Sequence, residues 1–242
     1  MAHGAPCLEA EAVPLVVDVG IGTPPDATVE LHRALRERWP EVRTLGVDVV
    51  RHYVDDLLAR QVEGIEARLG GSMLPLGSRE RPVVVRAINL LRGAHERDAN
   101  EGLQALAAPL APGGWVIEGS TDTEGDVGVV RVLRQTSDGL EEVALIMTTT
   151  FRRGFDPRLF TAWLPKGLGR HARPGPAVEA RFERWVAATK AARDAGDREA
   201  RATFVSAACR LAQVDDSVVR NTEEWSNGVL WWSAGPPAAP LR

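Results

Sequence analysis

Residues Leu15–Thr23 read LVVDVGIGT, and they indicate how the first half of this 242-residue chain folds. Four apolar residues and one acid are followed by two glycines set two positions apart, and a helical pattern begins near Asp26. This order is typical of a buried strand, a tight turn and a helix in an α/β protein. Because glycine carries no Cβ, Gly20 and Gly22 allow a ligand to approach the backbone closely.

Strand and helix patterns alternate beyond this stretch. Further strands are predicted at residues 44–48, 65–69, 83–85 and 115–118, with helices at 26–39, 49–63 and 96–110. Such alternation predicts right-handed crossovers and therefore an α/β, Rossmann-like, mostly parallel sheet that helices cover on both faces.

The pattern changes after Gly119. Two β-rich runs, Val127–Leu133 and Val143–Thr150, flank the turn signal Ser137–Gly139 and predict an antiparallel hairpin at the end of the sheet. Two helices are predicted beyond it, at residues 177–195 and 198–211, and a short strand at 229–230. We expect a ligand-binding domain over residues 1–150 and a helical extension or lid over residues 151–242. The tryptophans of the tail should pack in a core or lid (Trp225, Trp231 and Trp232).

The composition is that of an ordinary globular protein, with 44% hydrophobic and 26% charged residues. A net charge of -4 disfavours nucleic-acid partners without excluding them. Cys7 and Cys209 are the only cysteines, so we expect neither a disulfide framework nor a metal site. No apolar run reaches the roughly 20 residues that span a bilayer, and Met1–Glu11 lacks the features of a signal peptide. We therefore expect a cytoplasmic protein without membrane contact; its oligomeric state stays open.

A dinucleotide is the first candidate ligand. Its G-x-G-x-x-G fingerprint would need a third glycine where this chain has Pro25. Pro24 and Pro25 also lack the N–H groups that hold a pyrophosphate at a helix start. A P-loop is excluded because no G-K-[ST] follows the glycines.

A ligand with a ribose and an adenine but no phosphate fits better. It requires close backbone approach at Gly20 and Gly22 and an acid for the ribose hydroxyls. Asp48, at the end of the second predicted strand, can accept two hydroxyl hydrogen bonds.

Three motifs together resemble the class I S-adenosylmethionine-dependent methyltransferases. Val17–Gly22 is similar to their first motif, Gly46–Asp48 to their second-strand acid, and Leu110–Gly114 to the turn before their fifth strand. The similarity covers roughly residues 12–150. The strings at 86–91 and 118–121 further resemble a bacterial methylase-like subgroup.

The resemblance implies S-adenosyl-L-methionine as the cofactor and assigns residues to it. Gly20 and Gly22 would contact its amino-acid portion and ribose, Asp18 would orient the loop or the cofactor amine, and Asp48 would bind the ribose. The remaining expected contacts are Thr23, Val49, Ser72, Met73, Arg86 and Asn89. Family members often carry an acid near adenine, where this chain offers Ser72.

The methyl acceptor is not specified by the sequence. We expect a small molecule, with Glu118 as the best-placed general base and, as alternatives, a salt-bridged Glu118 or a solvated one. The basic residues that could hold an anionic acceptor are Arg152, Arg153, Lys166, Arg170, His171 and Arg173. A cofactor-binding protein without turnover is a second hypothesis, and a nicotinamide oxidoreductase is a third.

Overall fold

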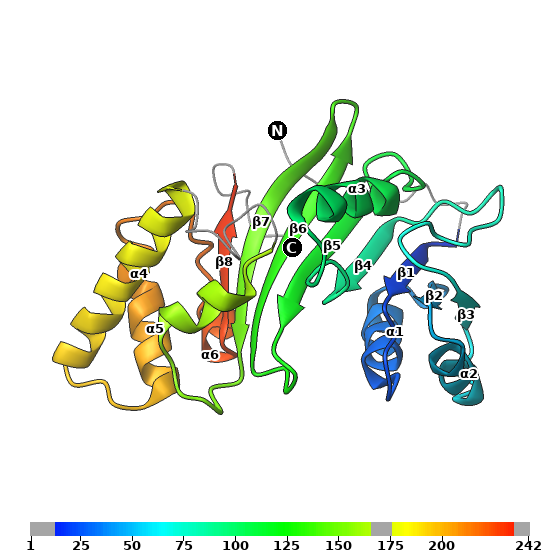
Figure 1. Ribbon diagram of the computed structural model, residues 1–242. Helices are drawn as coiled ribbons and strands as arrows, with labels where there is room; N and C mark the ends of the chain where they lie inside the picture. The colour runs from blue at the N-terminus through cyan, green and yellow to red at the C-terminus, as the bar shows by residue number, and fades with distance from the viewer. Residues whose placement is uncertain (1–12, 166–175, 235–242) are drawn as a thin grey trace. The chain divides into compact units, whose positions relative to one another are not determined.

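A computed structural model of the protein describes residues 13–165 and 176–234 (Figure 1). Its strands are hydrogen-bonded in the order β3-β2-β1-β4-β5-β6-β7-β8. The elements, in chain order, are β1 (Leu15–Val19), α1 (Asp26–Arg38), β2 (Arg43–Asp48), α2 (Arg51–Ala59), β3 (Ile65–Leu69), β4 (Val84–Ile88), α3 (Glu96–Ala107), β5 (Trp115–Thr121), β6 (Val127–Thr136), β7 (Gly139–Thr149), the 3-10 helix η1 (Pro157–Trp163), α4 (Pro176–Asp194), α5 (Ala200–Leu211), α6 (Thr222–Ser226) and β8 (Val229–Ser233).

The chain divides into two compact units. The first, here the N-terminal unit, comprises the described residues up to Glu118 together with Leu133–Glu141. The second, the C-terminal unit, comprises Gly119–Val132 and the described residues from Glu142 onward. The tip of the β6–β7 hairpin thus belongs to the N-terminal unit and its base to the C-terminal unit.

Parallel strands form the sheet of the N-terminal unit. β1 pairs in parallel with β2 on one side and with β4 on the other, and β2 pairs in parallel with β3. All five residues of β1 are buried, as expected for a central strand covered on both faces. The predicted bounds of β1 and β3 are confirmed, and the order 3-2-1-4-5 confirms the Rossmann-like fold class.

Side chains alternate between two cores on the faces of this sheet. Leu45 and Val47 of β2 belong to a cluster that includes Leu103 and Leu106 of α3. The intervening Gly46 faces α2 so closely that a Cβ there would lie 2.4 Å from Cδ2 of Leu57. Gly46 is therefore the residue that lets α2 pack tightly on the strand.

A long segment without regular structure joins β3 to β4 and covers part of the α3 face. Leu74 and Leu76 pack against the cluster of Leu45 and Val47. This segment supplies apolar cover next to β2 and β3 on the face opposite α2, where a helix would otherwise be needed.

The C-terminal unit begins with a meander. Asp122 N donates to Val127 O at 2.9 Å, so β5 turns directly into β6. A two-residue turn within the predicted signal Ser137–Gly139 joins β6 to β7. β7 then pairs antiparallel with β8. The predicted hairpin is confirmed, and both helices beyond it are found as α4 and α5. The strand expected at residues 115–118 is longer, since β5 extends to Thr121.

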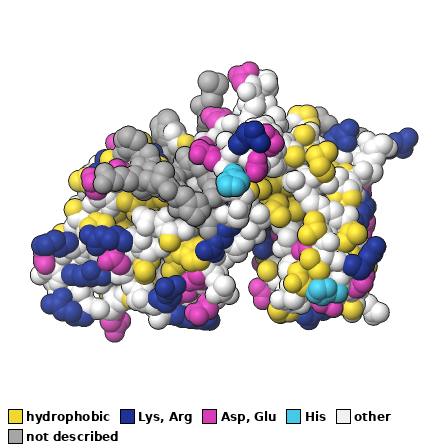
Figure 2. All heavy atoms as spheres, viewed as in Figure 1, with side chains coloured by type: hydrophobic (Ala, Val, Ile, Leu, Met, Phe, Trp, Pro, Cys, Tyr) yellow, Lys and Arg dark blue, Asp and Glu magenta, His cyan; other side chains and the backbone are white. Residues whose placement is uncertain are grey.

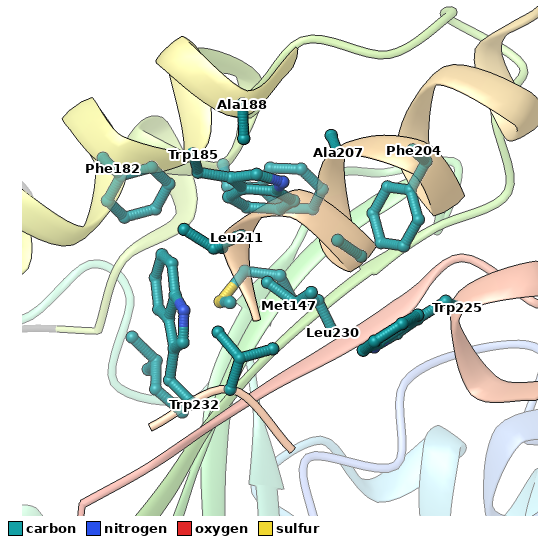
Figure 3. Close-up of a cluster of buried hydrophobic side chains, with 14 of the residues drawn as sticks. Met147, Phe182, Trp185, Ala188, Phe204, Ala207, Leu211, Trp225, Leu230 and Trp232 are labelled. Carbon is teal, nitrogen blue, oxygen red and sulfur yellow. The ribbon is translucent and has the colours of Figure 1, made fainter. Parts of the chain in front are cut away.

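Aromatic side chains form the core of this unit (Figure 3). Trp185 of α4 stacks on Phe160 with ring centroids 5.1 Å apart and meets the edge of Trp232 at 5.6 Å. Trp232 and Trp225 are 0% and 3% exposed. These two tail tryptophans are therefore core residues, and neither is an exposed stacking platform.

Candidate functional site

The strand order reverses beside β1, because the chain leaves β1 toward β2 on one side and returns to β4 on the other. In open α/β sheets, ligands bind beyond the carboxyl ends of the strands at such a switch point. The turn Gly20–Pro25 follows β1 at this place. The site expected from the sequence therefore lies where the topology favours ligand binding.

Both glycines of the turn adopt left-handed backbone conformations. Gly20 has φ +85° and Gly22 has φ +68°, values that residues with a Cβ rarely adopt. Gly20 N donates to Val47 O at 2.8 Å, which ties the turn to the end of β2. A Cβ built on Gly22 meets no atom within 4 Å. Open space thus lies beside Gly22, as close approach by a ligand requires.

Asp48 is bound to this turn by its carboxylate. Its Oδ2 accepts from Gly22 N at 3.2 Å, and its Oδ1 accepts from Val50 N at 2.9 Å. The residue is 7% exposed. A carboxylate offers about four acceptor positions, so two remain for ligand hydroxyls. The acid and the glycine that were expected to share a cofactor are thus in direct contact.

Asp18 lies beneath the turn in a buried polar cluster. Its Oδ2 accepts from Thr28 Oγ1 at 2.6 Å, and its Oδ1 lies 3.4 Å from Nε of Arg86. Burial raises the pKa of the Asp18 carboxyl, while Arg86 and the Thr28 hydrogen bond act in the opposite direction. Arg86 Nη1 also donates to Ala27 O at 3.4 Å. These contacts join β1, β4 and the first turn of α1, which are the elements around the glycine turn.

Asn89 follows β4 directly and has φ +62°. A non-glycine residue in this conformation marks a locally constrained backbone, and such positions cluster at functional sites. A Cβ on Gly20 would lie 3.9 Å from Cδ1 of Leu90 and 4.0 Å from Ile88 O. The two chain neighbours of Asn89 therefore reach the glycine turn.

Apolar side chains are exposed at the carboxyl ends of β2 and β3. Val49 is 72% exposed and Met73 is 80% exposed. A Cβ on Gly71 would lie 3.4 Å from Cγ1 of Val49, so the segments after the two strands touch. Ser72, which lies between Gly71 and Met73 in sequence, is half-buried. Thr23 belongs to the glycine turn, and its hydroxyl donates a hydrogen bond to Asp56 Oδ2 of α2 at 3.3 Å.

Glu118 lies inside β5, three residues before its end, and is 2% exposed. The shorter predicted strand had placed it at the carboxyl end. Since β5 continues through Gly119, Ser120 and Thr121, the acid that follows the strand is Asp122.

Two acids in the C-terminal unit were not singled out from the sequence. Asp122 is 7% exposed and pairs with Arg153 Nη1 at 3.2 Å. Asp126 is fully buried, and its carboxylate accepts hydrogen bonds from the backbone N–H groups of Thr150, Arg152 and Arg153. Burial alone would raise the pKa of Asp126, but these bonds and that from the Thr150 hydroxyl lower it. Asp126 therefore holds the chain after β7 in place.

The basic residues expected to bind an anionic acceptor are only partly described. Arg153 is paired with Asp122, whereas Lys166, Arg170, His171 and Arg173 lie outside the described residues. Elsewhere in the same unit a pocket of about 250 Å³ lies between η1 and α4. Its Arg158 and Lys190 pair with Asp156 and Asp194. Figure 2 shows basic side chains over this part of the surface with acidic ones among them, which is typical of a solvated face.

Among residues 13–165 and 176–234, no three His, Cys, Asp or Glu side chains gather to hold a metal ion. Within the same ranges no helix is both long enough and apolar enough to cross a bilayer.

Neither a protein-family model nor a curated protein matches the chain. Several solved structures resemble parts of it. In a complex that contains the Haloferax volcanii Trm112 methyltransferase activator, the matched chain is 23% identical to this one. The match covers 44% of this chain and 45% of that chain, with a TM-score of 0.36. CalS10, an amino pentose methyltransferase from Micromonospora echinaspora, is 18% identical. The match covers 56% of this chain and 59% of that chain, with a TM-score of 0.35. DszA carbon methyltransferase is 17% identical. The match covers 48% of this chain and 31% of that chain, with a TM-score of 0.40. In each case the match spans less than two thirds of the neighbour's length.

Proposed function

We propose that the protein is an S-adenosylmethionine-dependent methyltransferase that acts on a small-molecule nucleophile. The observation that carries this proposal is the direct contact between Asp48 and Gly22 at the switch point of the sheet. It joins a ribose-binding carboxylate to a glycine with open space beside it. An adenosyl ligand without phosphates needs both features in this arrangement.

The helix after the turn favours this ligand over a dinucleotide. α1 is preceded by Pro25, which has no N–H to offer, and its first turn carries the acid Asp26. A pyrophosphate at this helix start would meet a negative charge in place of a full set of backbone donors. The exposed apolar side chains of Val49 and Met73 are suited to cover an adenine ring.

When bound, the cofactor supplies a methyl group already activated by a sulfonium. The protein then needs mainly to orient its ligands and exclude water. Asp48 would hold the ribose and the backbone at Gly20 and Gly22 the amino-acid portion, while Asp18 and Arg86 keep the turn in shape. Asn89 and the residues near it would adjoin the methionine end. Glu118 is our proposed base, and a Glu118→Gln variant should lose turnover while keeping cofactor affinity.

Calorimetric titration tests the proposal directly. S-adenosylhomocysteine and NADH are titrated side by side into the full chain, and an Asp48→Ala variant is titrated in parallel. We expect S-adenosylhomocysteine to bind and NADH not to bind, with weaker binding in the variant. Tight binding of NADH alone would overturn the proposal.

A non-catalytic cofactor-binding protein is the second candidate. The 2% exposure of Glu118 favours it, because the proposed base would have to become accessible before it could accept a proton from a substrate. A screen of hydroxyl, amine, thiol and carbon acceptors with radiolabelled cofactor separates the two. Cofactor binding without any labelled product would support the non-catalytic protein.

A further inference from the structure

Residues Gly70–Pro75 form a closed turn at the carboxyl end of β3. At its start, Gly70 N donates to Asp48 O at 2.9 Å. At its end, Pro75 O accepts from Arg68 Nη1 at 2.9 Å. The two ends also touch, because a Cβ on Gly70 would lie 2.8 Å from Cδ of Pro75. Met73 lies within this turn and is 80% exposed.

An ion-pair network fixes the end of this turn. Arg68 Nη1 lies 2.6 Å from Glu80 Oε2, and Arg68 Nη2 donates to Glu80 Oε1 at 2.9 Å. Arg43 Nη2 reaches the same carboxylate at 3.3 Å, and Gly77 N donates to it at 2.7 Å. The Arg68 and Glu80 side chains are 30% and 17% exposed. A bidentate, partly buried pair of this kind holds its partners in a defined geometry.

The charge state of Glu80 agrees with this geometry. The hydrogen bond from Arg68 and that from Gly77 N lower the pKa of Glu80 to about 2. Glu80 is therefore a carboxylate at neutral pH, and the network is fully charged there.

The closed turn also touches the candidate cofactor site. Gly71 lies against Val49, the residue that follows Asp48, and Gly70 is hydrogen-bonded to Asp48 itself. Any change in the path of residues 70–75 must therefore act on the surroundings of Asp48. It would also move Met73, which lies in the same turn.

We propose that Arg68 and Glu80 are positioning residues for the adenine of the cofactor. They hold the turn Gly70–Pro75 so that Met73 and Val49 form apolar walls for the base, although neither charged residue is expected to touch it. This inference rests on the proposed function. It adds that the affinity for the base depends on an ion pair whose members lie outside the ligand-binding residues.

The test combines ligand affinity with local hydrogen exchange. Glu80→Gln removes the charge while keeping most of the side-chain volume, and Arg68→Met removes the hydrogen bonds that Arg68 donates to Pro75 and Glu80. We expect each variant to bind S-adenosylhomocysteine and adenosine more weakly by the same factor, roughly fivefold to twentyfold. Amide exchange should become faster over residues 70–77. Arg97→Gln, which breaks an exposed ion pair on α3 in the same unit, is the matched control and should change neither quantity.

A Met73→Ala variant makes the test independent of folding defects. Met73 is exposed, so this variant should keep its free energy of unfolding and lose affinity for adenosine. Combined with Glu80→Gln, it should lose less than the sum of the two single effects, because both act on one contact. Additive losses, or an unchanged affinity in Glu80→Gln with wild-type exchange at residues 70–77, would overturn the inference.

The outcomes separate this inference from the proposed function. If the wild-type chain binds neither S-adenosylhomocysteine nor adenosine, the proposed function fails, and the role in adenine binding fails with it. If the wild type binds both and Glu80→Gln binds them equally well, only the positioning role is wrong.

Discussion

Asp18 and Arg86 are register partners on the neighbouring parallel strands β1 and β4, with Asp18 Oδ1 3.4 Å from Arg86 Nε. The carboxylate is almost fully buried, whereas the Arg86 side chain is 21% exposed. A buried carboxylate is stabilised in its charged form by such a neighbour. This pair therefore joins β1 to β4 near the end of β1, which the glycine turn follows.

Replacing Arg86 by Met should leave Asp18 as a buried charge without its cation. We expect a loss of about 2–4 kcal/mol in the free energy of unfolding, measured by urea at neutral pH. The pKa of Asp18, already raised by burial, should rise further. Stability of the variant should then recover as the pH is lowered, since protonation removes the orphaned charge. A loss of stability that is independent of pH would contradict this role.

Replacing Gly22 by Ala tests the glycine turn against a matched control. Gly22 and Gly125 have φ +68° and +67°, and a Cβ meets nothing within 4 Å at either position. Both alanine variants should lose about 1–2 kcal/mol of stability through backbone strain. Only Gly22→Ala should lose affinity for S-adenosylhomocysteine in calorimetry. Equal affinities in the two variants would remove Gly22 from the binding site.

Replacing Asp48 by Ala should weaken binding of the same ligand by about 1–3 kcal/mol, since a buried hydrogen-bond partner is lost. The variant also frees the N–H groups of Gly22 and Val50, so some loss of stability should accompany it. Asp55→Asn, on the exposed side of α2, is the control and should bind normally. Unchanged affinity in Asp48→Ala would exclude ribose binding by this residue.

His32 should make stability depend on pH. Its ring is buried between Thr44 Oγ1 at 2.9 Å and Glu63 O at 3.0 Å. Burial lowers its pKa below the ordinary 6.5, and Arg36 adds to this effect, against the hydrogen bond to Glu63 O. The neutral ring is thus favoured in the folded state, so stability is complete above pH 6.5 and falls as the pH drops below it. In His32→Gln, the free energy of unfolding, measured with urea, should change less between about pH 7 and 5 than it does in the wild type.

Sequence periodicity was sufficient for most of the fold. Strands such as β1 and β3 carry a strong local signal, and their bounds agree with the structure. β5 was predicted too short because Gly119 and Ser120 are residues that commonly end a strand pattern, which pairing with β6 overrides. Helix α2 ends at Ala59, earlier than predicted, and Gln61 and Gly64 follow with positive φ.

The candidate site was predictable in part. The contact of Asp48 with Gly22 follows from motif order and topology. The Arg68–Glu80 pair could not be foreseen, because its members are separated by a segment without periodicity. The alternation of strand and helix patterns along the sequence also cannot reveal which charged residues meet in space. The pairing of Arg86 with Asp18 likewise depends on strand register.

The register of β1 with β4 has a consequence for the order of folding. Asp18 and Arg86 meet only after the ends of a segment of 67 intervening residues, which contains β2 and β3, have been brought together. The β6–β7 hairpin, by contrast, closes through a two-residue turn. Local contacts form faster than distant ones, because closing a long loop costs more chain entropy. The glycine turn should therefore acquire its final conformation late, after the hairpin has already formed.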